Sequence, residues 1–243
     1  MDYTPQNKLG TGLSRPVPVL CILVFFFLLV CTANAPLYAE DIKELRTMLE
    51  EGDWGAADTE TVLEIVREAA LEGIPPEMIA PRIKEGLAKN VPAPRLAAAI
   101  GKEISLLIEA RQVIRDVPGA EDFAGQLNLW QRTANLLSAG ISSGETRSLI
   151  EMCLRETEAF QPASALYVVL LEWGLPEEYS LQVVRAAVSS DLDYSEYSLL
   201  PSLFARARRD YIAPEDMVGR IVSELPNVGS VRQLENRVLD KRR

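Results

Sequence analysis

Apolar residues recur along most of the chain with the spacing of amphipathic α-helices. Residues 61–72 place four apolar side chains on one stripe, and residues 95–115 follow the same rule over about six turns. Residues 217–225 give the most regular face of this kind. By composition alone, residues 165–171 could form a buried strand. Because a lone strand has nothing to pair with, we predict a core helix there.

Short helix-entry phrases recur between these stripes. Each is an apolar residue followed by Pro, Ser, Asp or a small residue, often with an acid close behind. The apolar residue fixes the entry angle of the new helix, the next residue caps it, and the acid meets its positive end. The phrases begin at Ile74, Val91, Ile141, Phe160, Leu175, Leu192, Ile212 and Val228. Most intervals are close to the length of one helix plus one tight turn, so two of them make a hairpin of about 34 residues. The longer interval from Val91 to Ile141 is expected to contain further units.

This pattern predicts an all-α fold, an array of short antiparallel helices. Two arrangements remain open, a solenoid-like stack of helical hairpins and an irregular helical bundle. We expect an N-terminal helical segment at 40–117 and a C-terminal helical segment at 120–232, divided by a break at 116–119. The charged tail at 233–243 is expected to fray.

One stretch carries a local resemblance. Residues 73–96, GIPPEMIAPRIKEGLAKNVPAPRL, resemble the repeat units of a group of uncharacterised secreted bacterial proteins, whose pattern is GLP…EGLAKGVPPERI. The resemblance covers about a tenth of the chain. It implies short α-helical repeats and export, and it implies no catalytic activity. Asn90 stands where the group usually has Gly, which is compatible with a left-handed position just after a helix.

Residues 1–39 have the organisation of a targeting segment. A basic beginning precedes an uncharged apolar core at 17–31, which is shorter than the roughly 20 residues of a permanent membrane span. Small residues follow, and we expect a signal peptide that is cleaved after Ala39. This predicts a periplasmic or cell-envelope protein. The alternative is an uncleaved anchor, with membrane contact through residues 17–35 alone.

The amino-acid composition excludes several kinds of catalytic and binding site. The 243 residues include no His, and 25 Lys and Arg oppose 35 Asp and Glu, a net charge of −10. The lack of imidazole excludes Ser-His-Asp and Cys-His catalysis and His-ligated zinc. The acidic excess argues against a nucleic-acid partner, because duplex binding depends on clustered Lys and Arg. Two of the three cysteines lie in the targeting segment, so Cys153 is expected to be a buried apolar residue. We expect no cofactor and no metal.

Residues 140–144, Gly-Ile-Ser-Ser-Gly, have the G-x-S-x-G form of a nucleophile elbow. Such an elbow needs a strand before it and a His to accept the serine proton, whereas here a helix is predicted and no His exists. A capping box explains each residue instead. Gly140 ends one helix, Ser142 caps the next, and Glu145 completes the box.

A pair of carboxylates is the kind of active site that remains possible without His, because glycan hydrolases use two carboxyl groups. The candidates are Glu50 with Glu51, Glu177 with Glu178, Glu156 with Glu158, and Asp191, Asp193 and Glu196. Adjacent acids on a helix point about 100° apart, so we interpret them as solvated faces and helix-start charges. The segment that starts at Asp191 resembles a calcium loop but lacks the glycine and the final glutamate that such a loop needs.

Aromatic residues and arginines mark a candidate partner-binding region at 173–211. Tyr and Trp are favoured anchors at interfaces, and the arginines suit an anionic partner. The competing interpretation is that the aromatic residues pack in the core and that the arginines neutralise acidic helices. The candidate residues are Trp173, Tyr179, Tyr194, Tyr197, Tyr211, Arg206, Arg208 and Arg209.

These observations predict an exported, non-catalytic helical binding or scaffold protein of the bacterial cell envelope, with another envelope protein as its partner. Two alternatives stay open. A carboxylate-dependent envelope glycan hydrolase would place two acids across a cleft at about 5–10 Å. A membrane-tethered assembly factor would differ only in keeping residues 17–35.

Overall fold

The computed structural model describes residues 38–52 and 54–239. The predicted signal peptide and the apolar core at 17–31 therefore fall outside the described residues, apart from the last two positions of the signal segment. Twelve α-helices and three short 3-10 helices make up the described part, which contains no strand. The prediction of an all-α fold is confirmed. Within the same residues, no helix combines the length and the apolar character needed to cross a membrane.

The chain divides into two compact units, and the first ends at Pro76. Its described part is a helical hairpin of α2 (Ala39–Glu50) and α3 (Ala56–Leu71). The hairpin buries apolar side chains of both helices, which supply most of its stability. These buried residues are Leu45, Leu49, Val62, Leu63, Val66 and Ala69.

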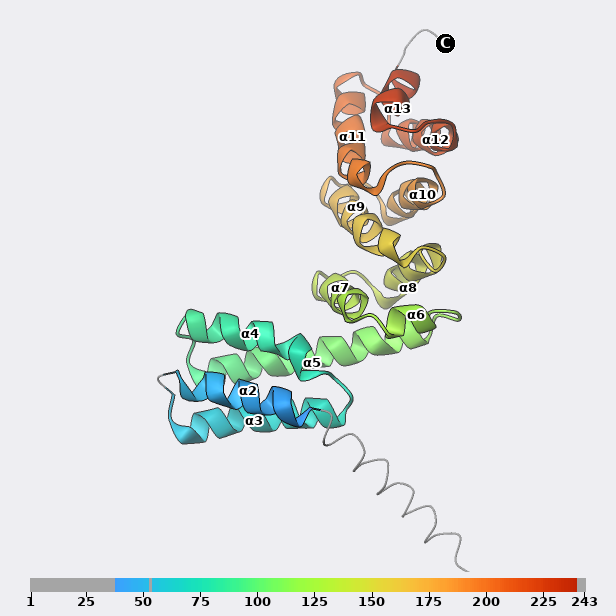
Figure 1. Cartoon of the computed structure of the whole chain (residues 1–243). Helices are drawn as coiled ribbons and strands as arrows, with labels where there is room; N and C mark the ends of the chain where they lie inside the picture. Colours follow the sequence, from blue (N-terminus) through green and yellow to red (C-terminus); the bar gives the residue numbers. More distant parts are fainter. Residues whose placement is uncertain (1–37, 53, 240–243) are drawn as a thin grey trace, which may run out of the picture. The chain divides into compact units, whose positions relative to one another are not determined.

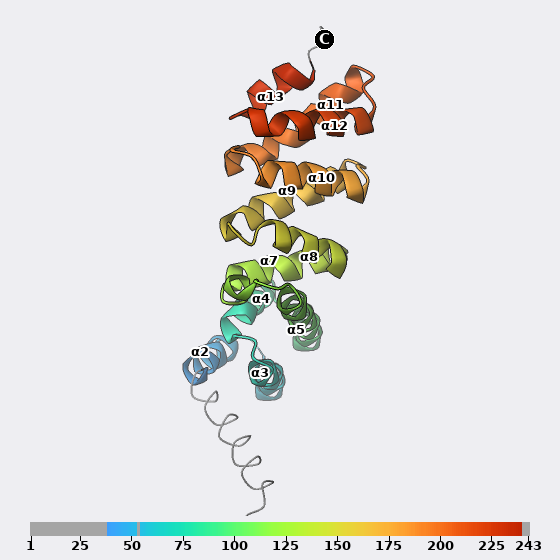
Figure 2. The ribbon, with the colours of Figure 1, turned by 90° about the vertical axis from the view of Figure 1, so that its right-hand side faces the viewer.

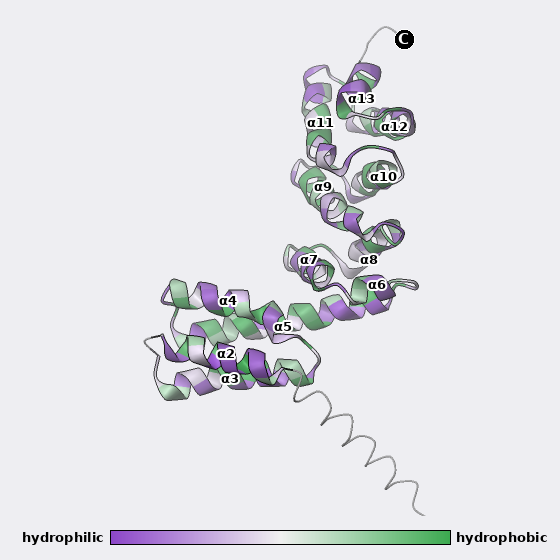
Figure 3. Ribbon diagram, viewed as in Figure 1, coloured by the Kyte–Doolittle hydropathy of each residue, from purple (hydrophilic) through white to green (hydrophobic). Residues whose placement is uncertain are grey.

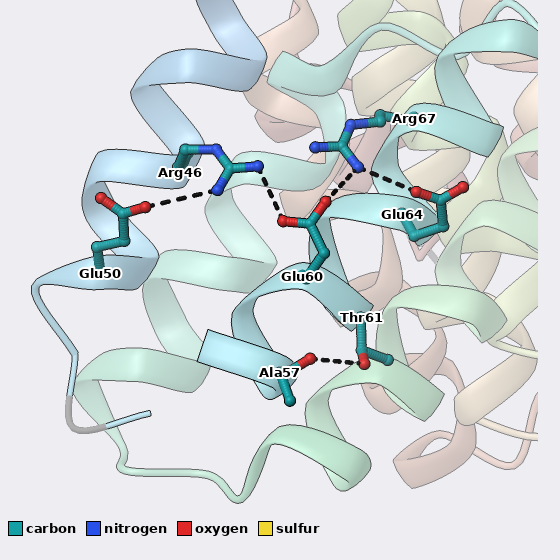
Figure 4. A network of polar contacts seen from close by, with 7 residues as sticks. All are labelled: Arg46, Glu50, Ala57, Glu60, Thr61, Glu64 and Arg67. Carbon is teal, nitrogen blue, oxygen red and sulfur yellow. Dashed lines mark hydrogen bonds and ion pairs between the residues drawn. The ribbon is translucent and has the colours of Figure 1, made fainter. Parts of the chain in front are cut away.

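Charged side chains form a network across the outside of this hairpin (Figure 4). The guanidinium of Arg46 on α2 lies 2.9 Å from the carboxylate of Glu60 on α3, and Arg67 lies 2.7 Å from the same carboxylate. Arg67 and Arg46 together hold the pKa of Glu60 below its ordinary value. All three side chains are exposed enough that solvent screens these pairs, so they orient the two helices more than they stabilise them.

The second unit begins at Glu77 and opens with the hairpin of α4 (Pro76–Ala88) and α5 (Ala93–Arg115). Gly86 allows the close packing within this hairpin, because a Cβ at that position would lie 2.6 Å from a methyl carbon of Leu96. Since the two units divide at Pro76, the break expected at 116–119 is instead a turn inside the second unit.

Three more hairpins follow α5 and the short α6, and they stack on one another (Figures 1 and 2). The helices are α6 (Glu121–Ala124), α7 (Leu127–Ser138), α8 (Ser143–Met152), α9 (Phe160–Glu172), α10 (Glu177–Val188), α11 (Leu200–Arg209), α12 (Pro214–Glu224) and α13 (Val231–Val238). The first helices, α7, α9 and α11, lie side by side in one layer, and the second helices, α8, α10 and α12, form the other. Of the two arrangements left open by the sequence, this unit has the stack of hairpins.

The turn between α7 and α8 shows how a hairpin tip is built. Gly140 has a left-handed φ of 87°, the N–H of Ile141 donates to the carbonyl of Leu136 at 3.1 Å, and the N–H of Gly140 donates to Leu137 at 3.0 Å. These are the two hydrogen bonds of a Schellman motif. The same pair of bonds, with a positive φ, occurs at Gly73, Asn90, Gly174 and Tyr211. Asn90, which the sequence showed to be compatible with a left-handed position, has a φ of 49°.

Of the remaining entry phrases, those at Phe160 and Val228 directly follow 3-10 helices, whereas the phrase at Leu192 leads into one. Two of these 3-10 helices connect successive hairpins, and the third connects α12 to α13. These helices are η1 (Thr157–Ala159), η2 (Tyr194–Leu199) and η3 (Leu225–Asn227). The strand-like residues 165–171 lie in α9, as predicted. The expectation that the tail frays does not hold for residues 233–238, because α13 buries Leu234 and Val238. Green and purple alternate along α13 and most other helices in Figure 3, as in amphipathic helices that cover a core.

Candidate partner-binding surface

Two exposed aromatic residues lie at neighbouring hairpin tips. Trp173 directly follows α9 and is 52% exposed, while Tyr211 follows α11 and is 96% exposed. The helices α9 and α11 pack side by side, and both end at the edge of the stack where the hairpin turns lie (Figure 2). Trp173 and Tyr211 therefore belong to one edge of the molecule, which we call the tip edge.

Tyr211 is unusual for its position. It occupies the left-handed position that Gly140 and Gly174 hold in the other two stacked hairpins, with a φ of 57°. A residue with a Cβ loses about 1–2 kcal/mol there relative to glycine. Because its ring is almost fully exposed, packing within the chain does not offset that loss. A strained backbone that serves no visible structural purpose is a reason to look for a functional one.

The three predicted arginines lie in the last turn of α11, and they differ in their contacts. Arg208 and Arg209 are exposed in the last turn of α11, and Asp210 separates them from Tyr211. Arg206 forms an ion pair with Glu235 of α13 and so joins two helices of the stack. Arg206 thus fits the competing interpretation of local neutralisation, whereas Arg208 and Arg209 remain at the tip edge.

The remaining predicted tyrosines lie elsewhere. Tyr197 is only 1% exposed, and its ring meets that of Tyr194 edge to face at 5.7 Å between centroids. Burial raises the pKa of Tyr197 well above the ordinary tyrosine value. Tyr194 donates its hydroxyl to Glu156, and Tyr179 is half-buried in α10. Tyr197 is therefore a core residue, and Tyr194 is part of the packing around it.

The G-x-S-x-G motif forms the predicted capping box. The N–H of Glu145 donates to Ser142 Oγ at 3.2 Å, and the N–H of Ser142 donates to Glu145 Oε2 at 2.8 Å. Gly140 ends α7 and Ser142 begins α8. The two hydrogen bonds satisfy backbone N–H groups that a helix start leaves without partners.

Several candidate carboxylates also hold structural positions. Glu50 lies 3.6 Å from Arg46, Glu156 accepts the hydroxyl of Tyr194, and Asp193 accepts the backbone N–H of Ser195 at 2.8 Å. The side-chain and backbone hydrogen bonds from Ser195 lower the pKa of Asp193. Among the described residues, no group of three or more Cys, Asp and Glu side chains is placed to hold a metal ion.

A shallow cavity of about 230 Å³ lies between α8 and α10. Its lining is polar and of mixed charge, consisting of Ser148, Glu151, Met152, Arg185 and Ser189. No motif indicated this cavity, because its residues come from two hairpins and share no sequence pattern. Its small volume is below the usual range for binding sites of small molecules.

Comparisons with protein-family models, with curated proteins and with solved structures found no match. The chain's function must therefore be inferred from its own residues and their arrangement.

Proposed function

We propose that this chain is an exported, non-catalytic helical binding protein of the bacterial cell envelope, and that its tip edge docks another envelope protein. In this proposal Trp173 and Tyr211 are the aromatic anchors, and Arg208 and Arg209 contribute charge beside them. Stacked hairpins suit this role, because their turns repeat along one edge and present side chains over a long distance.

The observation that carries the proposal is the conformation of Tyr211. Its backbone is strained and its ring is 96% exposed, so glycine would serve the folded chain better. Tyr and Trp are the residues that most often become binding hot spots, because they cover a large apolar area and lose little side-chain entropy. A partner that buries the ring would supply the stabilisation that is missing in the isolated chain.

The proposal is tested by photo-crosslinking in the source bacterium. The full-length chain would carry a photoreactive phenylalanine analogue at position 211 or 173, or at position 199 as a control. Leu199 is 49% exposed but lies at the opposite end of α11. We expect one discrete envelope-protein adduct from positions 211 and 173 and none from 199. Equal adducts from all three positions, or none from the tip edge, would overturn the proposal.

A second variant separates binding from folding. Tyr211→Gly relieves the backbone strain, so the free energy of unfolding should stay the same or rise. With the photoreactive residue at position 173, the same substitution should reduce the yield of the crosslinked adduct by about tenfold. Export is tested separately by N-terminal sequencing of the protein from the envelope fraction. A start at Glu40 supports cleavage, whereas a start at Met1 supports the membrane-tethered alternative.

A further inference from the structure

Charge is divided unevenly between the two layers of the stack. The helices α7, α9 and α11 contain four arginines and one acidic residue, Glu172. The facing layer of α8, α10 and α12 contains seven acidic residues and three arginines. In a chain with a net charge of −10, the α7–α9–α11 layer is thus locally basic. Anions approaching the protein are favoured at this layer and disfavoured at the other.

Arg132 is the arginine of this layer that the structure positions most firmly. It lies on α7, half-buried, and its Nε donates to Ser164 Oγ on α9 at 2.7 Å. Ser164 is fully buried and donates in turn to the carbonyl of Gln161 at 3.0 Å. The hydroxyl therefore holds the guanidinium in place against α9, and the plane of the guanidinium is oriented before any ligand arrives.

The charge of Arg132 is not balanced by a nearby acid. Within the described residues, none of the ion pairs involves Arg132. Burial lowers its pKa, which reflects the desolvation of the guanidinium. A buried or half-buried charge without a counter-charge destabilises the protein, and a carboxylate supplied from outside would compensate it with a paired hydrogen bond.

The helix between α7 and α11 is α9, which carries no charge before its last residue, Glu172. Before Glu172, the exposed or half-exposed positions on α9 are Gln161, Pro162, Ala165, Val168, Val169 and Leu171. Adjacent helices pack about 8–10 Å apart, so crossing from α7 over α9 to α11 takes about 18 Å. An extended peptide covers that distance with about six residues.

We infer that the outward face of the α7–α9–α11 layer binds an acidic, extended segment of a partner protein, with one carboxylate on Arg132 and another on Arg209 about six residues away. Small apolar side chains of that segment would lie over Ala165 and Val168 on α9. This inference rests on the proposed binding function and specifies the chemistry of the partner.

The test uses a fluorescent heptapeptide with glutamate at both ends and alanine, valine and glutamine between them, added to the full chain in an anisotropy titration. We expect saturable binding that weakens as salt rises, and no binding of the same peptide with glutamine at both ends. Arg132→Gln should weaken binding by about tenfold or more. Arg185→Gln removes the same charge from the opposite layer and should leave binding unchanged.

A second variant, Arg209→Gln, separates a loss of binding from a loss of folding. Arg209 is exposed at the end of α11, so its replacement should not affect folding. Arg209→Gln should also weaken binding of the peptide. Equal losses in Arg132→Gln and Arg185→Gln, or equal binding of the uncharged peptide, would overturn the inference. Binding of a single-stranded oligonucleotide in preference to the acidic peptide would overturn it as well.

The two proposals can fail separately. If crosslinking from Tyr211 succeeds while Arg132→Gln leaves peptide binding intact, the tip edge remains the docking site and the acidic segment is wrong. If the peptide binds through Arg132 while the tip edge yields no adduct, the tip-edge proposal is wrong and the basic layer remains as the binding surface.

Discussion

The hydroxyl of Tyr167 on α9 donates a hydrogen bond to the carboxylate of Glu145 on α8. Glu145 also completes the capping box at the start of α8, so one side chain both begins a helix and joins two consecutive hairpins. Tyr167 is fully buried, and the bond gives its hydroxyl the partner that a buried polar group needs. A local cap and a contact between hairpins thus depend on the same carboxylate.

The cap itself can be tested with Ser142→Ala. The substitution removes the acceptor for the N–H of Glu145 and should lower the free energy of unfolding by about 1 kcal/mol, measured by urea denaturation. Ser148→Ala is the matched control, because its hydroxyl bonds only to a carbonyl of its own helix. Its effect should stay within about 0.5 kcal/mol. Labelling of Ser142 by a serine-directed phosphonate would contradict a purely structural role.

Glu145 should make stability depend on pH in the acidic range. Burial raises its pKa, but the hydrogen bonds from Ser142 and Tyr167 outweigh burial, so the pKa in the folded protein is lowered from 4.5. A lowered folded pKa stabilises the protein above the unfolded pKa, and this contribution disappears as the pH falls through the folded value.

We therefore expect wild type to exceed Glu145→Gln in urea midpoint at about pH 7, and the difference to shrink at about pH 3. Glu151→Gln, on the same helix, serves as the control. A difference between wild type and Glu145→Gln that is independent of pH would contradict the assignment.

Tyr211→Gly should stabilise the isolated protein. Removing the Cβ from a left-handed position should gain about 1 kcal/mol, reduced by the greater freedom of glycine in the unfolded chain. The reverse substitution at the equivalent turn, Gly174→Ala, should lose about 1 kcal/mol, because Gly174 has a φ of 82°. Thermal unfolding of both variants measures the pair. A destabilised Tyr211→Gly would mean that the ring supports the fold.

Two other glycines should respond in opposite directions to alanine. Gly86→Ala places a Cβ against buried Leu96 and should destabilise by about 1–3 kcal/mol. Gly101 lies inside α5 with open space around it, so Gly101→Ala should stabilise by up to about 1 kcal/mol. Denaturation curves of the two variants should therefore move to either side of wild type, and a shift in the same direction would refute the packing described for α4 and α5.

Cys153 should be inert in the folded protein. The thiol is fully buried, and burial raises its pKa to about 12, so very little thiolate exists at neutral pH. We expect a maleimide or a disulfide reagent to label Cys153 only after denaturation. Rapid labelling of the native protein would show that the region between α8 and η1 opens often.

The sequence predicted features that depend on a few adjacent residues. The capping box at Ser142, the left-handed Asn90 and the core helix at 165–171 follow from hydrogen-bonding groups and backbone preferences within one or two turns. These signals do not depend on what the helix later packs against, so they could be interpreted without the fold.

Features that depend on contacts between helices could not be predicted in this way. Tyr197 and Tyr211 have the same side chain and lie close in sequence, yet one is in the core and the other is exposed, because the stacking of hairpins decides which is covered. No local sequence pattern marks Arg132, because the position of its guanidinium depends on Ser164 in another hairpin. The first part of the charged tail forms a helix for the same reason, because the end of the stack covers Leu234.

At the tips of the three stacked hairpins, a single apolar residue closes one helix with its N–H and immediately precedes the cap of the next, as Ile141 does between Gly140 and Ser142. Such a turn contains no residue beyond those that end one helix and begin the next. One inserted residue would rotate the following helix by about 100° and point its apolar stripe toward water. Insertions and deletions should therefore be tolerated in the 3-10 connections at the opposite edge and should destabilise the fold at the tips. The fixed length of the tips keeps the spacing between successive hairpins constant, and a bound partner would have to match that spacing.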